Sequence, residues 1–346
     1  MPSPMPCLNR SKPLTKPQRP RASGQAAHQE QGSIEMQHVL RGLCIASVFV
    51  CVSGCAFAPH STRNATIEKA LSAGFQHQTP RDFPGLVLVK RSQPGSASRL
   101  AAAETKPPIP PRFIIFIEGD GAAWRRSGTK PPTDPTPKRL IPLELAILES
   151  RLLDQHPGPE GSNTFIAYVS RPCQFRLSKE CNEALWTSAR FGSRVQELMN
   201  VALWNIVRAT LIREGAKNEG QPRLSLVGYS GGGTIAALLA ASRGDVDCLV
   251  TFAAPLDTDA WVENQGLSPL TGSQNPVALL DRLGSLRSHH FVGENDSVVR
   301  LEALGEFAIP TNSRKVHLIP ETSHTLGWTN SWKHLRQLTC LRQTHE

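Results

Sequence analysis

Several features that would place this chain in a well-defined class are missing from its sequence. No run of lysine or arginine is long enough for a nucleic-acid-binding patch, although the 346 residues carry a net charge of +9. No segment repeats with a period of 20–50 residues, which argues against solenoids and propellers. No apolar run reaches the roughly 20 residues that a membrane-spanning helix requires. No Cys-x-x-Cys or paired-histidine spacing is present, so no metal site is expected.

The N-terminal part differs from the rest of the chain. Residues 1–35 are rich in proline, serine, glutamine and basic residues and show no apolar periodicity, so we expect a disordered leader. Residues 36–54 contain Arg41 followed by a short apolar run and small residues, the pattern of a secretory signal. This pattern predicts that translation begins at Met36. Residues 1–35 would then not be translated, and their presence in the sequence would come from a start codon assigned too far upstream.

The end of the signal resembles the lipobox of bacterial lipoproteins, on the four residues Val52-Ser53-Gly54-Cys55. In that family the cysteine is acylated and becomes the new N-terminus. The resemblance implies that Cys55 carries a lipid anchor and that the protein is exported to the bacterial cell envelope, held at a membrane. An ordinary signal peptide, an uncleaved anchor and a buried cytosolic helix are the alternatives.

Four cysteines lie beyond the signal and the lipidation site: Cys173, Cys181, Cys248 and Cys340. An even number in an exported chain favours disulfides. We favour Cys173–Cys181, which closes a short loop, together with Cys248–Cys340, although four cysteines allow three pairings.

The composition is 39% hydrophobic, enough for a large core.

The periodicity after the signal predicts an α/β domain. Residues 55–84 are expected to form a tether with a short helix at 65–75, and residues 85–346 the main domain. Strands are predicted at 85–91, 112–121, 163–170, 223–228, 248–255, 289–293 and 316–320, and helices at 143–155, 193–214, 234–242 and 332–342. Alternation of helices with apolar strands indicates a doubly wound, mostly parallel sheet. Functional residues of such sheets follow the carboxyl ends of the strands.

The strand at 223–228 runs into Gly228-Tyr229-Ser230-Gly231-Gly232, which matches the G-x-S-x-G nucleophile elbow. A phosphate-binding loop is excluded because no Lys-Ser/Thr pair follows. Two alternatives stay open on this stretch alone. The segment 231–236 also fits the dinucleotide fingerprint G-x-G-x-x-A, with Asp257 as its acid, and the glycines can simply allow close packing of helix on strand.

The rest of the chain favours the nucleophile. Asp296 and His324 each follow a later strand, so serine, acid and histidine occur in the order expected of the elbow. Residues 85–342 resemble the α/β-hydrolase superfamily. The resemblance is carried by Gly228–Gly232, Gly293–Asp296 and Ser323-His324. The resemblance implies a nucleophilic Ser230, a general base His324 and an orienting Asp296, in a fold of the α/β-hydrolase type with a small cap or loop insertion.

The resemblance also implies an oxyanion site. Its backbone N–H donors would be Gly231 and Asp120, the latter in the Glu118-Gly119-Asp120-Gly121 turn. A carboxylate at this place is unusual, so we expect the Asp120 side chain to turn away or to form a salt bridge with Arg125 or Arg126. The alternative is that this turn is only a tight acidic turn.

Other residues near strand ends have weaker signals. Asp257 is the alternative acid, or caps the following helix. The segment 256–285 is long for a connection and is expected to act as a cap over the pocket. The stretch from Arg171 to Arg190 is either a disulfide-pinned loop over the site or a stabilised surface loop. His317 is expected to be structural, and His289 and His290 to be structural or surface groups.

The sequence therefore predicts a serine hydrolase that cleaves a carboxylic ester or related acyl bond through an acyl-enzyme. No cofactor and no nucleic acid are expected; the partners are a small-molecule or lipid ester substrate and, through the anchor, a membrane. The alternatives are a non-catalytic envelope lipoprotein that uses the fold as a binding module, and a nucleotide-dependent oxidoreductase.

Overall fold

A computed structural model describes residues 62–93, 109–121, 130–155, 163–215 and 220–342. The described helices and strands lie within residues 57–346, which form one compact unit. The predicted leader at 1–35, the predicted signal at 36–54 and Cys55 lie outside the described residues. Among the helices that the structure describes, none is long and apolar enough to cross a membrane.

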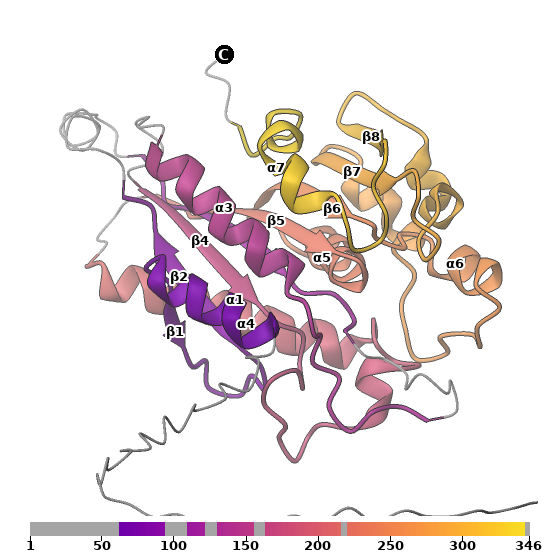
Figure 1. Cartoon of the computed structure of the whole chain (residues 1–346), viewed down its shortest axis with the longest axis horizontal. Helices are drawn as coiled ribbons and strands as arrows, with labels where there is room; N and C mark the ends of the chain where they lie inside the picture. Colours follow the sequence, from indigo (N-terminus) through magenta and orange to yellow (C-terminus); the bar gives the residue numbers. More distant parts are fainter. Residues whose placement is uncertain (1–61, 94–108, 122–129, 156–162, 216–219, 343–346) are drawn as a thin grey trace, which may run out of the picture. The chain divides into compact units, whose positions relative to one another are not determined.

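Eight strands form one sheet in the order β1-β2-β4-β3-β5-β6-β7-β8 (Figure 1). The strands are β1 (Gln76–Gln78), β2 (Val87–Arg91), β3 (Arg112–Ile117), β4 (Thr164–Val169), β5 (Arg223–Tyr229), β6 (Val246–Phe252), β7 (Arg287–Gly293) and β8 (Arg314–Ile319). Strand β2 is antiparallel to both neighbours, and the remaining pairs are parallel. The carboxyl ends of β3 to β8 therefore meet at one edge of the sheet.

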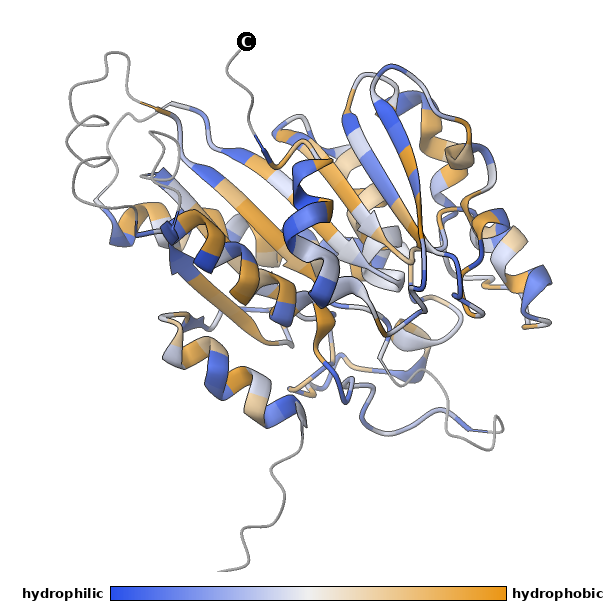
Figure 2. Cartoon of the chain, turned by 45° about the horizontal axis from the view of Figure 1, so that its top comes forward, coloured by the Kyte–Doolittle hydropathy of each residue, from blue (hydrophilic) through white to orange (hydrophobic). Residues whose placement is uncertain are grey.

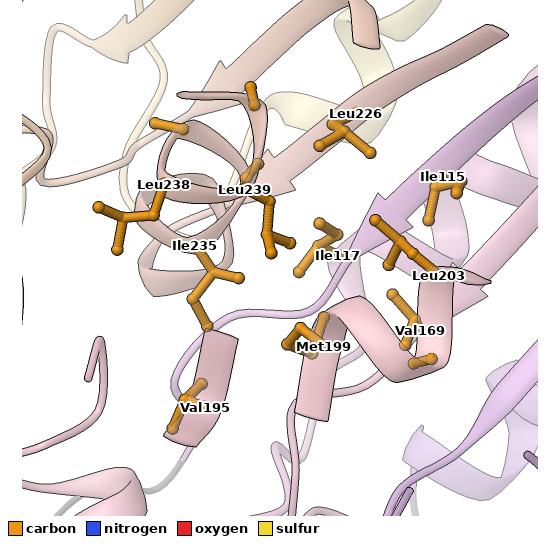
Figure 3. Packing of buried hydrophobic residues seen from close by; sticks show 14 of the residues in the cluster. Ile115, Ile117, Val169, Val195, Met199, Leu203, Leu226, Ile235, Leu238 and Leu239 are labelled. Atoms are coloured by element: carbon orange, nitrogen blue, oxygen red, sulfur yellow. The ribbon is translucent and has the colours of Figure 1, made fainter. Parts of the chain in front are cut away.

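Helices cover both faces of this sheet. Side chains alternate along each strand, so the apolar strands present side chains on both faces, and both faces must be covered. The helices are α1 (Thr62–Ser72), α3 (Ile141–Gln155), α4 (Ser193–Arg213), α5 (Gly231–Ser242), α6 (Thr258–Asn264) and α7 (Trp328–Gln337). Ile115 and Ile117 of β3 pack with α4 and α5 on one face (Figure 3). Ile114 and Phe116 point to the opposite face, into the cluster that includes α1, α3 and α7. The predicted doubly wound, mostly parallel α/β fold is confirmed.

The hydropathy of the elements follows their depth in the fold. Figure 2 shows hydrophobic colouring along the central strands and bands of both colours on the helices. Strands β3 and β4 are buried along their whole length, whereas β8 at the edge is largely half-exposed. Full burial of each large apolar side chain contributes about 1.5–3 kcal/mol, so the central strands form a rigid base for the loops at their ends.

The structure differs from the sequence prediction at several elements. Helix α1 covers 62–72 instead of 65–75, and β3 ends at 117 instead of 121. Strand β1 was not predicted, because its residues are polar and it joins the sheet edge through backbone pairing with β2. Helix α5 begins at Gly231 instead of residue 234, because the turn at Ser230 leads directly into the helix. Helix α7 covers 328–337 instead of 332–342, because Trp328, Trp332 and Leu335 form its buried face.

Candidate active site

Ser230 occupies the turn between β5 and α5, in a backbone conformation that L-residues rarely adopt. Its φ is 51° and its ψ is −131°. Such a residue persists only where its surroundings enforce the conformation. The Ser230 N–H donates to the carbonyl of Phe252 at 2.8 Å, which ties the turn to β6. Ser230 is half-buried between buried neighbours, and it borders a cavity at the N-terminus of α5.

The glycines around Ser230 allow close approach of backbone to backbone. A β-carbon at Gly228 would lie 2.4 Å from the carbonyl oxygen of Gly232, and one at Gly232 would lie 2.3 Å from the carbonyl oxygen of Glu118. A β-carbon at Gly233 would lie 2.5 Å from that of Ala254. Larger residues would therefore push the turn away from β3 and the helix away from β6.

Asp296 and His324 meet beyond the ends of β7 and β8. The His324 Nδ1 lies 2.9 Å from Oδ2 of Asp296. The other oxygen of the buried Asp296 accepts the backbone N–H groups of Val298 and Val299, both at 2.8 Å. These bonds fix the carboxylate, and with it the ring of His324.

The backbone of His324 is held separately. Its carbonyl accepts the hydroxyl of Tyr229 at 2.7 Å and the indole Nε1 of Trp328 at 2.9 Å. Tyr229 is the neighbour of Ser230, and burial, with the nearby carboxylates of Glu118 and Asp296, raises its pKa. The hydroxyl is therefore neutral and donates, and it connects the serine turn to the histidine loop.

One cavity of about 590 Å³ brings three of the predicted residues together, Ser230, His324 and Asp120, whereas Asp296 and Gly231 are not among its lining residues. Its lining includes Ser230, His324, Gly119 and Asp120. The remaining lining residues are of mixed character, apolar, charged or carrying a hydroxyl: Glu118, Gly121, Pro137, Lys138, Arg139, Ile141, Arg190, Tyr229, Trp261, Leu267, Val298 and Thr325. Trp261 and Leu267 belong to the segment 256–285, so part of this predicted cap shapes the cavity.

The carboxylate of Asp120 forms ion pairs with two arginines. Nη1 of Arg171 pairs with Oδ1, and Nη1 of Arg190 lies 3.2 Å from Oδ2. The sequence prediction named Arg125 or Arg126 as partner, and both lie outside the described residues. The prediction of a salt bridge holds, but the partners come from the loop after β4, because the parallel strands bring that loop beside the one after β3.

Gln174 fixes the backbone of the same turn. Its Nε2 donates to the carbonyl of Gly119 at 2.9 Å, and its Oε1 accepts the N–H of Arg171 at 3.0 Å. Gln174 is buried, so both bonds are shielded from water. Gln174 was not predicted as a site residue; its position directly after β4 was the only signal in the sequence.

Glu118 is a second buried acid beside the cavity. Its Oε1 accepts the N–H of Gly119 and its Oε2 accepts the hydroxyl of Tyr168, both at 2.9 Å. Burial outweighs these bonds and raises the pKa of Glu118 to about 8. The side chain is thus largely protonated at neutral pH and places little negative charge next to Asp120.

Both favoured disulfides are present in the structure. Cys173–Cys181 closes the loop that carries Gln174, directly after Arg171. Cys248–Cys340 ties β6 to the chain after α7. The loop from Arg171 to Arg190 is therefore more than a surface loop, because three of its side chains hold the turn after β3.

The other candidates take structural positions. Asp257 caps α6 by accepting the N–H groups of Asp259 and Ala260, both at 3.2 Å. His290 Nδ1 lies 2.9 Å from the Thr251 hydroxyl. His289 and His317 contact each other at 3.2 Å. Within the described part of the chain, no group of three metal-ligating side chains is found.

Several solved structures are similar to this chain, each at low sequence identity. No protein-family model matches the sequence, and no curated protein sequence matches it. XC6422 from Xanthomonas campestris, an α/β serine hydrolase without lid, is 12% identical over 78% of this chain and 96% of its own, with a TM-score of 0.42. Est1E from Butyrivibrio proteoclasticus is 10% identical over 76% and 96%, with a TM-score of 0.45. Pyrococcus horikoshii acylaminoacyl peptidase is 11% identical over 82% and 44%, with a TM-score of 0.47.

Proposed function

We propose that the protein is a serine hydrolase that cleaves a carboxylic ester, or a related acyl bond, through a covalent acyl-enzyme. One observation carries the proposal: Ser230, in its strained turn, and His324, which is paired with Asp296, line the same cavity. A serine hydroxyl is a weak nucleophile at neutral pH and needs such a base beside it.

Acylation begins with attack of the Ser230 Oγ on the substrate carbonyl. Because Nδ1 of His324 faces Asp296, the Nε2 atom is the nitrogen that accepts the serine proton. Asp296 keeps the ring in this tautomer and stabilises its positive charge. His324 then protonates the leaving alcohol as the tetrahedral intermediate collapses to the acyl-enzyme.

The negative oxygen of the intermediate requires N–H donors. Gly231 is the first residue of α5, where backbone N–H groups have no partner within the helix. The N–H groups of Gly231 and Asp120 form no hydrogen bond with the described part of the protein. Both are therefore available to a substrate oxygen, and the partial positive charge of the helix N-terminus adds to their effect.

Deacylation repeats these steps with water. His324 removes a proton from the water molecule, whose oxygen attacks the acyl carbon. Collapse of the second tetrahedral intermediate releases the carboxylic acid and returns the proton to Oγ of Ser230.

We further propose that the enzyme acts in the bacterial cell envelope as a lipoprotein anchored through Cys55. The signal-like residues 36–54 and the two disulfides support an oxidising compartment. Mass analysis of the mature N-terminus tests this: an acylated Cys55 supports the anchor, and a free Cys55 or another cleavage site contradicts it.

Hydrolysis of 4-nitrophenyl butyrate tests the catalytic proposal. Ser230→Ala and His324→Ala are expected to lower kcat by at least about 10³-fold, and Asp296→Asn to lower it strongly through the wrong histidine tautomer. Ser297→Ala is the matched control, because this exposed serine adjoins Asp296 without a side-chain hydrogen bond to the described residues. Full activity of folded Ser230→Ala would exclude the mechanism.

A further inference from the structure

The ion-pair cluster beside the catalytic turn has an excess of positive charge. We call Asp120, Arg171 and Arg190 the Asp120 cluster; it holds two guanidinium groups and one carboxylate. Arg171 is 2% exposed and Arg190 is 4% exposed. Glu118, the nearby acid, does not balance the charge, because burial raises its pKa to about 8. Charges that leave water are normally paired, so an excess of this kind is a feature to explain.

Arg190 is the member of the cluster that borders the cavity. Its Nε donates to the carbonyl of Thr187 at 2.7 Å, and its Nη1 pairs with Asp120. Its Nη2 has no hydrogen-bond partner among the residues that the structure describes. Trp261, which also lines the cavity, lies against the guanidinium at 5.7 Å and helps to keep it in place.

Arg171 has a different position. It holds Asp120 from behind and donates through Nη2 to the carbonyl of Arg190, and it is not among the residues that line the cavity. Burial and the charge of Arg190 lower the pKa of Arg171 to about 9, and burial lowers the pKa of Arg190 to about 10, so both guanidinium groups stay charged at neutral pH. The excess charge is therefore presented to the cavity through Arg190.

The Asp120 cluster is also close to the reacting atoms. A β-carbon at Gly231 would lie 2.2 Å from Oδ1 of Asp120, so the carboxylate that binds Arg190 touches the residue after Ser230. The exposed side chain of Lys138 adds a further positive charge to the cavity lining. A ligand group bound at Arg190 would thus belong to the same molecule as the bond that Ser230 attacks.

We propose that the substrate carries a carboxylate near its scissile acyl bond and that Arg190 binds this carboxylate through Nη2. The inference rests on the proposed hydrolase function and names its substrate class. The apolar lining around Trp261 and Leu267 receives the carbon chain between the two groups. Because a charge-assisted hydrogen bond is about twice as strong as a neutral one, the enzyme should prefer an acid over its uncharged amide.

Matched substrates test the proposal. The 4-nitrophenyl monoesters of glutaric and adipic acid are compared with the same esters whose free carboxyl is a primary amide, and Ser230→Ala supplies the background rate. We expect kcat/KM for the better acid to exceed that for its amide by about tenfold or more. Arg190→Gln should bring this ratio close to one, and Arg190→Lys should restore part of it.

Arg171→Gln is the control that separates binding from positioning. It removes a partner of Asp120 without changing the cavity lining, so it should lower kcat/KM for acid and amide alike. A ratio near one in the wild type, or an unchanged ratio in Arg190→Gln, would overturn the inference while hydrolysis of the amide ester upholds the proposed function. If neither ester is hydrolysed while 4-nitrophenyl butyrate is, this inference fails alone; if none of the three esters is hydrolysed, the proposed function and this inference both fail.

Discussion

The side-chain oxygen Oδ1 of Asp120 lies so close to Gly231 that a β-carbon at position 231 would be 2.2 Å from it. The same carboxylate is held by Arg171 and Arg190. The two residues proposed to donate N–H groups to the oxyanion are therefore packed against each other, and neither can be enlarged without displacing the other.

Gly231→Ala should damage the site more than the fold. The added methyl group meets a carboxylate that two arginines prevent from moving, so the Asp120 turn must shift. We expect kcat/KM to fall by about 10²-fold, as for loss of one oxyanion donor, and stability to fall by about 1–3 kcal/mol. Gly244→Ala is the control, because nothing lies within 4 Å of a β-carbon there. Equal activity of both variants in an ester assay would contradict this packing argument.

Gln174→Met should reduce turnover and leave substrate binding nearly intact. The change leaves the carbonyl of Gly119 and the N–H of Arg171 without their partners. The Asp120 N–H then loses its fixed direction, which matters in the transition state more than in the ground state. We expect kcat to fall about tenfold with KM within about twofold. A rise in KM of about tenfold with unchanged kcat would contradict this and would show that Gln174 serves substrate binding instead. The control is Gln337→Met, because Gln337 is exposed.

Glu118→Gln should change how stability depends on pH. Folding raises the pKa of Glu118 from 4.5 to about 8, so its contribution is fully favourable below pH 4.5 and is lost as the pH rises to about 8. Glutamine keeps an acceptor for Gly119 and cannot ionise. The quantity to compare is the free energy of unfolding of the variant minus that of the wild type. Between pH 4.5 and pH 8 this difference should shift in favour of the variant by up to about 5 kcal/mol. Urea unfolding at both pH values measures this; a difference that does not change with pH would contradict it.

Removing one disulfide should mainly lower stability, and removing the other should mainly lower activity. Their sequence separations are 8 and 92 residues, for which loop-closure entropy predicts about 2–3 and 4–5 kcal/mol. Cys248→Ala/Cys340→Ala should therefore unfold at lower denaturant than Cys173→Ala/Cys181→Ala. Cys173→Ala/Cys181→Ala should lose more activity than Cys248→Ala/Cys340→Ala, because the shorter loop carries Gln174 and adjoins Arg171. Loss of activity in proportion to stability alone would contradict this assignment.

Chain order predicted which candidate residues would gather at one edge of the sheet. Ser230, Asp296 and His324 each follow a strand, and parallel strands end at one edge, so their proximity was predictable. Asp120 was placed by the same argument. The partners of Asp120 were not, because Arg171 and Arg190 reach it from another loop, and many arginines could satisfy a carboxylate. The neutral state of Glu118 depends on its burial beside Tyr168, which no local pattern reveals.

The most direct test of the account is the site of covalent labelling by a fluorophosphonate. Intact-protein mass spectrometry, followed by peptide mapping, measures how many adducts form and where. We predict one adduct per chain, on Ser230, and its absence in Ser230→Ala and after heat denaturation. Folded protein that forms no adduct, or an adduct on a residue other than Ser230, would contradict the central claim.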